Sequence, residues 1–223
     1  MVETQMTLDK QEAGIAAYQH GDFAAALRLF QPLAEHGDAS AQCNLGVMYE
    51  QGRGVAQNYR EAMRWFRLAA LQGDASAQSN LGVMYYKGQG IAQDYGEARK
   101  WYRMAAEQRN PEAQFNLGVM YARGQGVPRD DASSLMWMAK AAKLGDAAAQ
   151  YSLGMTQRRQ SFGKTPVATE SRIESYKWFQ LAAAQGYADS ELNRDSVGLG
   201  LSREDVAEGA RRAAEFVIGP PKI

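Results

Sequence analysis

A 36-residue internal repeat constrains this chain more than any other feature. Three segments share one pattern, and their equivalent leucines Leu45, Leu81 and Leu117 are 36 residues apart. A fourth, degenerate copy follows, in which a five-residue insertion places Trp178 41 residues after Trp137. The regular copies span 38–73, 74–109 and 110–145, and the degenerate copy spans 146–186. A period of this length predicts an array of stacked units in which no copy can bury its apolar face alone.

Each regular copy predicts two helices. In the first copy, apolar residues recur at helical spacing before Gly52 and again after Asn58. They are Ala41, Leu45, Met48 and Tyr49, and then Ala62, Trp65, Phe66, Ala69 and Ala70. Glycine suits the left-handed turn that ends a helix, whereas asparagine and aspartate suit its start. We therefore expect Gly52 to end the first helix, Asn58 to begin the second, and Asp38, Asp74 and Asp146 to cap first helices.

Both flanks of the repeats also predict helices. Residues 8–37 read as a further pair with a shorter turn at Gly21–Phe23, and 187–218 read as C-terminal capping helices. Ser202 is a suitable cap for the last helix, and Gly219–Pro221 would end it. One face of that helix reads as apolar, namely Val206, Ala210, Ala213, Ala214 and Val217. The prediction is an all-α protein in which 1–223 form a single repeat domain.

The repeat resembles a known family. The pattern A-x-x-x-L-G-x-M-Y-x-x-G-x-G-V, followed by A-x-x-W-[FY]-x-x-A-A-x-x-G, is similar to the SEL-one-like repeat, a relative of the tetratricopeptide repeat. Matching residues in the first full copy are Ala41, Leu45, Gly46, Tyr49, Gly52, Gly54, Val55, Ala62, Trp65, Ala69, Ala70 and Gly73. Residues 8–37 look closer to an ordinary tetratricopeptide pair. The resemblance implies a right-handed α-α superhelix (solenoid), here of about five helix pairs plus the capping helix, with a concave face lined by first helices. It also implies an adaptor that binds other proteins and is exported in many bacteria.

Composition narrows the class of function. Formal net charge is +0 and the basic residues form no block, so we expect neither nucleic-acid binding nor attraction to an anionic membrane. No apolar run is long enough for membrane insertion. No export signal is visible at the start, which predicts a soluble, cytoplasmic protein, or a periplasmic one if a signal was removed.

The sequence offers little for chemistry. Its single cysteine, Cys43, excludes an internal disulfide, and its two histidines, His20 and His36, fall at predicted helix ends. The Gly52-x-Gly54 turn lacks the strand and the third glycine of a dinucleotide fingerprint, and it recurs with the repeat. Methionines that recur at the same repeat position, such as Met48, are predicted to lie in the core, and so are Met136 and Met138. We therefore expect no cofactor, no metal and no enzymatic activity.

The candidate partner-binding residues are first-helix positions that vary between copies while the framework stays fixed. They are Tyr86, Lys87, Phe115, Arg123 and Tyr151. Aromatic side chains beside basic ones suit a partner segment of acidic character. A second interpretation is that Phe115 and Tyr151 merely pack between helices.

Two further questions stay open at this stage. The leading hypothesis is a scaffold that binds a protein or peptide as a monomer or weak homodimer. The alternatives are an exported envelope or periplasmic regulator that also acts by binding, and an enzyme. The irregular loop predicted at 161–169 is either a binding feature or a tolerated insertion.

Overall fold

The computed structural model describes residues 2–163 and 165–216, and every regular element in these ranges is a helix. The chain forms two compact units, Met1–Asn110 and Pro111–Ile223. The first unit holds α1 (Val2–Gln19), α2 (Phe23–Glu35), α3 (Ala39–Gln51), α4 (Tyr59–Leu71), α5 (Ala75–Lys87) and α6 (Tyr95–Glu107). The second holds α7 (Pro111–Arg123), α8 (Asp131–Lys143), α9 (Ala147–Gln160), α10 (Pro166–Ala183), α11 (Ser190–Gly198) and α12 (Arg203–Ala214). The predicted all-α class is confirmed, and the single domain stays a prediction.

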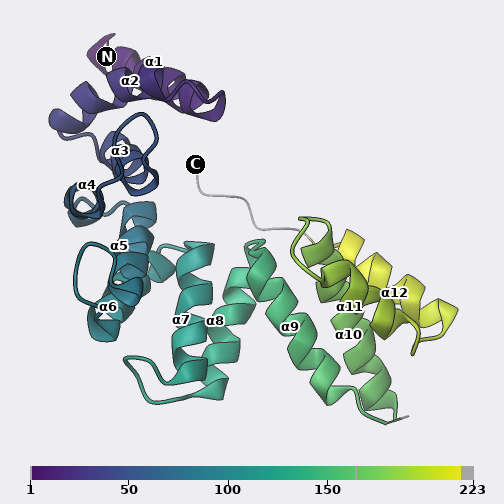
Figure 1. Cartoon of the computed structure of the whole chain (residues 1–223). Helices are drawn as coiled ribbons and strands as arrows, with labels where there is room; N and C mark the ends of the chain where they lie inside the picture. The colour runs from purple at the N-terminus through teal and green to yellow at the C-terminus, as the bar shows by residue number, and fades with distance from the viewer. Residues whose placement is uncertain (1, 164, 217–223) are drawn as a thin grey trace. The chain divides into compact units, whose positions relative to one another are not determined.

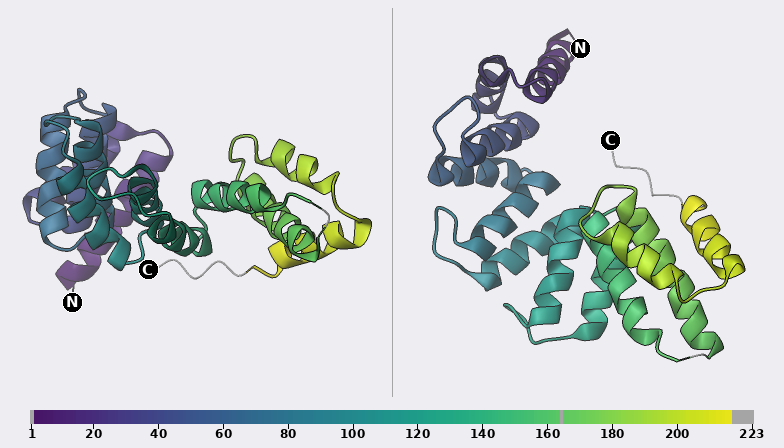
Figure 2. Two further views of the ribbon diagram at one scale, coloured as in Figure 1. Left: turned by 90° about the horizontal axis from the view of Figure 1, so that it is seen from below. Right: turned by 45° about the vertical axis from the view of Figure 1, so that its right-hand side comes forward.

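Within each unit the helices pack as consecutive pairs (Figure 1). In the first unit every helix from α1 to α6 packs on the next, so three pairs are stacked. In the second unit α7 to α10 form two pairs, and both α11 and α12 pack on α10 (Figure 2, yellow-green and yellow). No helix in the described ranges is long and apolar enough to cross a membrane.

The predicted helix boundaries are confirmed by their caps. The Oδ1 atoms of Asp38, Asp74 and Asp146 each accept a 2.7 Å hydrogen bond from the backbone N–H three residues later. Asn58 caps α4 in the same way, and Gly52 ends α3 in the left-handed conformation with φ 69°. These side chains satisfy backbone donors that the first helical turn leaves without partners.

Close packing within a pair depends on glycine in the first helix. A Cβ atom on Gly46 would lie 2.6 Å from the ring of Phe66, and one on Gly82 would lie 2.4 Å from the ring of Tyr102. The looser first pair shows the same arrangement, because a Cβ on Gly14 would lie 2.6 Å from Phe30. The second helix can therefore approach only where the first helix has no side chain.

The tryptophan position is less uniform than the repeat suggests. Trp65 and Trp178 are buried, whereas Trp101 and Trp137 are half-buried. The ammonium group of Lys140 lies 4.1 Å from the centre of the Trp137 ring, so this ring faces a cation on one side. A fully buried tryptophan in each copy is therefore not a feature of this chain.

Buried glutamines join successive pairs, a role that was not expected from the sequence. The amide of Gln42 donates to the carbonyl of Ala34 in the preceding pair, at 3.0 Å, and Gln78 donates likewise to Ala70 at 3.1 Å. Each glutamine also accepts from the end of its own second helix, Gln42 from Gln72 at 2.8 Å and Gln78 from Gln108 at 2.9 Å. The signal was visible, because glutamine recurs at 42, 78, 114 and 150.

The insertion in the fourth copy lengthens a helix rather than a loop. α10 has 18 residues where α4, α6 and α8 have 13 each, and this difference equals the five inserted residues. Thr165 caps α10 and Pro166 occupies its first turn, a position that suits proline. The predicted loop 161–169 is therefore wrong beyond Thr165, and Lys164 lies outside the described residues.

The chain's last described helix differs in part from expectation. Ser202 caps α12 as predicted, in a capping box with Asp205. Gly209 and Ala213 are buried against α10, but Ala210 and Ala214, expected on the apolar face, are exposed. Val217 and the predicted stop at 219–221 lie outside the described residues.

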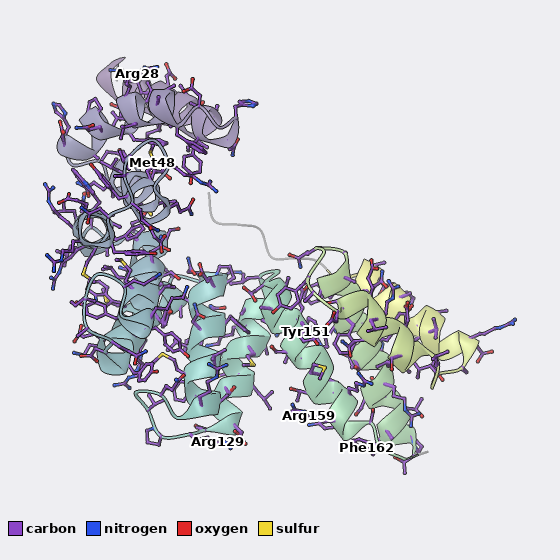
Figure 3. All side chains as sticks on the ribbon, in the orientation of Figure 1. Arg28, Met48, Arg129, Tyr151, Arg159 and Phe162 are labelled. Carbon is purple, nitrogen blue, oxygen red and sulfur yellow. The ribbon has the colours of Figure 1, made fainter. Side chains whose placement is uncertain are left out.

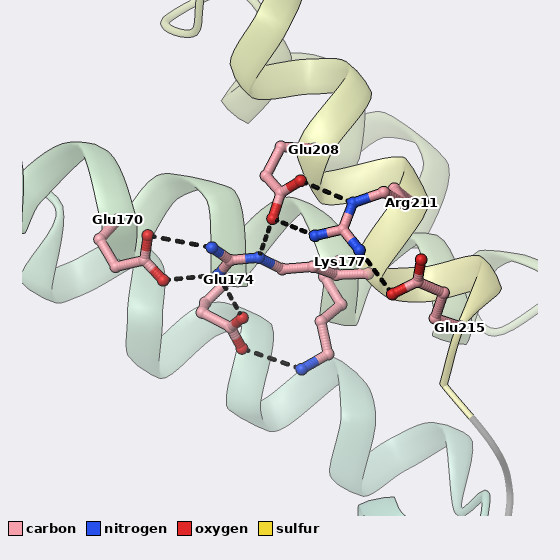
Figure 4. A network of polar contacts seen from close by, with 7 residues as sticks. Glu170, Glu174, Lys177, Glu208, Arg211 and Glu215 are labelled. Atoms are coloured by element: carbon pink, nitrogen blue, oxygen red, sulfur yellow. Dashed lines mark hydrogen bonds and ion pairs between the residues drawn. The ribbon is translucent and has the colours of Figure 1, made fainter.

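Ion pairs hold α12 on α10 (Figure 4). The guanidinium of Arg212 on α12 lies 2.5 Å from Glu170 and 2.8 Å from Glu174 on α10, and it also pairs with Glu208 at 2.8 Å. Glu208 in turn accepts from Arg211 at 2.7 Å. Arg212 therefore connects α12 with two residues of α10 that lie 42 and 38 positions earlier in the sequence.

Candidate functional site

A groove in the second unit is a candidate for partner binding. It has a volume of about 650 Å³ and is lined mainly by α8 and α9, with one residue from the last turn of α7 and one from the connection into α8. Its lining residues are Ala122, Arg129, Asp131, Ser134, Leu135, Met138, Tyr151, Ser152, Met155, Thr156 and Arg159. We call it the α8–α9 groove. Its volume is in the range typical of ligand pockets in proteins.

The lining of the α8–α9 groove combines apolar and polar side chains in similar measure. The hydroxyl of Ser152 donates to the carbonyl of Ala148 at 2.8 Å, and that of Thr156 donates to the carbonyl of Ser152 at 2.9 Å. Because these donors bond to their own helix, methyl and methylene groups are left to face a bound segment. Two methionines, Met138 and Met155, add flexible side chains that adapt to irregular surfaces.

Two of the three charged residues of the groove pair with each other, and the third is exposed at the end of α9. Arg129 binds Asp131 through two parallel hydrogen bonds of 3.0 and 3.1 Å, and this pairing lowers the pKa of Asp131. Arg159 is exposed in the last turn of α9 (Figure 3). The groove therefore carries one neutralised pair and one further cation, which favours a partner with some acidic character.

Tyr151 is fixed in place from several sides. Its ring centre lies 5.5 Å from that of Phe179 and 5.4 Å from that of Tyr187. Its hydroxyl accepts a 3.3 Å hydrogen bond from the side-chain amide of Asn193 on α11. Tyr151 thus both packs between helices and lines the groove, so the two interpretations of this residue are compatible.

The five residues predicted from sequence are divided between the two units. Tyr86 and Lys87 belong to the first unit, where the Tyr86 ring lies 5.3 Å from that of Tyr95 and Lys87 is exposed. Phe115 is half-buried and packs against the cluster that contains Trp178. Arg123 is exposed at the end of α7. Of the five, only Tyr151 lines the α8–α9 groove.

Phe115 occupies a position that faces neighbouring helices in other copies. Its equivalents Cys43 and Ser79 are 7% and 1% exposed. The structure therefore favours the packing interpretation of Phe115.

Sequence reasoning also missed the contribution of α8. Leu135 and Met138 line the groove from this second helix, whereas recognition was expected on first helices. Met136 was predicted to be core but is 46% exposed, while Met48, Met84 and Met120 are fully buried as predicted. One signal for α8 was visible in the sequence. The position that holds an aromatic residue in the first two copies, Phe66 and Tyr102, holds Met138 in the third.

The described residues show no arrangement suited to catalysis. Cys43 is buried, and burial followed by the nearby charge of Asp74 raises the pKa of its thiol well above the usual range. His36 caps the end of α2, where its Nδ1 lies 2.7 Å from the carbonyl of Pro32. Among the described side chains, no three histidine, cysteine, aspartate or glutamate residues are grouped as a metal site.

Comparison with known families identifies the repeat. The family model described as Sel1 repeat matches residues 13–38, 39–74, 75–110, 111–146 and 147–187. The chain belongs to the Sel1 repeat family. The match includes 13–38, which the sequence alone set apart as tetratricopeptide-like. Sel1 repeat proteins are in general non-catalytic modules for protein interaction.

Solved structures resemble this Sel1 repeat protein over most of its length. One is c5321, a protective antigen of uropathogenic Escherichia coli with an SLR fold, at 36% identity and a TM-score of 0.72. The match covers 96% of this chain but 46% of c5321, so the chain spans about half the length of that protein. A Sel1 repeat protein from Oxalobacter formigenes is 30% identical, with a TM-score of 0.73 and coverage of 91% and 83%.

A third structure shares only the fold. The immunity protein Pa5087 of Pseudomonas aeruginosa is 16% identical, with a TM-score of 0.57 and coverage of 91% of this chain and 81% of its own. Among the curated proteins, none matches the chain.

Proposed function

We propose that this Sel1 repeat protein is a non-enzymatic scaffold that holds a segment of a partner protein in the α8–α9 groove. The observation that carries the proposal is the groove itself, which combines apolar side chains, two adaptable methionines among them, with an exposed cation at Arg159. Methionine and arginine are enriched at protein interfaces relative to the rest of a protein surface. The general role of Sel1 repeats in protein interaction supports the same conclusion. Binding on a concave face, as the resemblance implied, stays a prediction.

The occupant that fits best is a short segment rather than a folded surface. A volume of about 650 Å³ accepts a few side chains, and the Arg159 end suits a carboxylate. Export to the envelope, the second hypothesis from sequence, would change where the partner is found and not how the groove binds it.

Two neighbouring residues on α8 provide a matched test. Leu135 lines the groove and is 38% exposed, whereas Met136 does not line it and is 46% exposed. Wild type, Leu135→Glu and Met136→Glu would be used as baits for crosslinking in the cells that produce the protein, and captured proteins would be compared by quantitative mass spectrometry. We expect a partner that Leu135→Glu loses and Met136→Glu retains. The same set of proteins with all three baits would refute the proposal.

A further inference from the structure

The outer face of α4 combines arginines with exposed leucines. Arg60, Met63, Arg64, Arg67, Leu68 and Leu71 follow one side of the helix and form a shallow groove of about 340 Å³, which we call the α4 face. Leu68 is 39% exposed and Leu71 is 71% exposed, while Trp65 and Phe66 on the same helix are buried. The helix therefore has two apolar sides, and only one of them is used by the repeat core.

Comparison with α6 shows that the α4 face is unusual within this chain. Arg67 and Arg103 are equivalent residues, and Arg103 pairs with Glu107 one turn later at 3.0 Å. The residue of α4 equivalent to Glu107 is Leu71. In place of an internal ion pair, α4 thus presents a guanidinium beside an exposed leucine.

The outward-facing cations of α6 and α4 also differ in how many of them have a carboxylate partner. On α6, Lys100 pairs with Glu97 at 2.5 Å, so both outward cations have a carboxylate of their own. On α4, Arg64 pairs with Glu61 at 3.1 Å. Among the described residues, Arg60 and Arg67 have no carboxylate partner. The α4 face therefore has two uncompensated cations next to apolar side chains.

We propose that the α4 face is a second docking surface, which binds an acidic, leucine-containing segment of a partner protein. Carboxylates of such a segment would take the place that Glu107 has beside Arg103, and its leucines would cover Leu68 and Leu71. Arginine pairs with carboxylates through two parallel hydrogen bonds, so this surface selects for acidic segments as well as attracting them. The α4 face belongs to the first unit, and the α8–α9 groove belongs to the second.

A designed peptide and four variants test this surface. The probe is a fluorescein-labelled helical peptide of roughly 16 residues, with leucine at every third or fourth position and glutamate beside each leucine. Its binding would be followed by fluorescence polarisation to wild type, Arg67→Glu, Leu71→Glu, Arg103→Glu and Leu135→Glu. Leu71→Glu gives α4 the residue of α6, and Arg103→Glu is the matched control on α6. Leu135→Glu alters only the α8–α9 groove.

The expected result is binding that Arg67→Glu and Leu71→Glu each weaken about tenfold or more, which is the scale of one interfacial charge pair. Arg103→Glu and Leu135→Glu should change the affinity less than about twofold, because exposed pairs away from the contact contribute little. Raising the salt concentration from about 50 to about 300 mM should weaken binding, since screening shortens the reach of the arginines.

Several outcomes would overturn the proposal. One is the absence of binding at a peptide concentration of about 100 μM, which is the scale of weak association. Another is equal binding of a control peptide that has lysine in place of glutamate. Equal loss with Arg103→Glu would place the contact elsewhere. Binding to vesicles containing phosphatidylserine, without binding to the acidic peptide, would assign the face to a lipid surface instead. Circular dichroism of each variant separates loss of binding from loss of folding.

Discussion

The side-chain amide of Gln72 donates a 2.8 Å hydrogen bond to the side-chain oxygen of Gln42, which is 4% exposed. The amide of Gln42 at the same time donates to the carbonyl of Ala34 at the end of α2. A single buried side chain therefore connects the second helix of one pair, α2, with both helices of the next. Buried amides are costly unless both ends have partners, so these bonds fix how one pair sits on the next.

Replacing Gln72 with leucine is expected to lower the free energy of unfolding by about 1–2 kcal/mol, because the buried oxygen of Gln42 loses its donor. Leucine is the residue that the third copy has at the equivalent position, Leu144, so the variant suits a helix end of this repeat. Urea denaturation would measure the change. Gln31→Leu is the control, since Gln31 donates to Glu35 in solvent at 3.0 Å and its loss should cost less than about 0.5 kcal/mol. Equal losses in both variants would contradict the role given to Gln42.

Gly82→Ala is expected to destabilise the first unit by roughly 1–3 kcal/mol, the usual cost of overpacking a core. The added Cβ would lie 2.4 Å from the ring of Tyr102, which is 2% exposed and has little room to move. The matched control is Gly198→Ala in α11, where the nearest atom of Tyr176 is 3.4 Å away and the contact is ordinary. Thermal unfolding followed by circular dichroism should show a lower midpoint for Gly82→Ala alone. A stable Gly82→Ala variant would mean that the pair can separate at little cost.

The repeat itself made the helices and caps predictable. Asp38, Asn58 and Gly52 occupy positions that local backbone chemistry dictates, so one copy shows where helices begin and end in the others. The glutamines at 42, 78, 114 and 150 recur just as regularly, but a polar residue gives no periodicity signal for burial. Their role depends on contacts between pairs, which local reasoning does not reach.

The candidate site was harder to predict for a physical reason. Met138, which lines the α8–α9 groove, takes the position that Phe66 holds in the first copy, so this part of the groove differs between copies. Variation alone does not distinguish an exposed position from a buried one, and Phe115 shows this, since its equivalent Ser79 is 1% exposed. Leu135 and Met155 became candidates only when the contacts between helices were known.

The attachment of α12 is expected to weaken in acid. Hydrogen bonds from Arg211 and then Arg212 lower the pKa of Glu208 from 4.5 to about 2. Because the folded pKa lies below the unfolded one, this contribution to stability is complete above pH 4.5 and is lost as the pH falls toward 2. The pKa of Glu174 is lowered too: burial alone would raise it, but hydrogen bonds from Arg212 and Lys177 outweigh that effect. Because the intrinsic rate of amide exchange itself falls in acid, the quantity to follow is the protection factor of the amides in Arg203–Ala214, which should decrease between these pH values.

Arg212→Gln is the variant that isolates this effect. It removes the pairs with Glu170, Glu174 and Glu208 together, so the protection factors in α12 should already be low at pH 7 and should change less on acidification. Arg203→Gln, at an exposed residue of the same helix, should leave the pH profile unchanged. If Arg212→Gln kept the wild-type profile, packing such as the contact of Phe216 with Trp178 would hold α12 instead.

The thiol of Cys43 is expected to react only when the first unit opens. It is 7% exposed, and burial, followed by the charge of Asp74, raises its pKa, so very little thiolate is present even in mild alkali. Labelling with Ellman's reagent should therefore be slow in the native protein at both pH 7 and pH 9, and complete within minutes in denaturant. Gln51→Cys in a Cys43→Ser background is the control, because Gln51 is exposed and serine is the residue of the second copy at Ser79. Fast native labelling of Cys43 would show that α3 separates from its neighbours far more often than its burial implies.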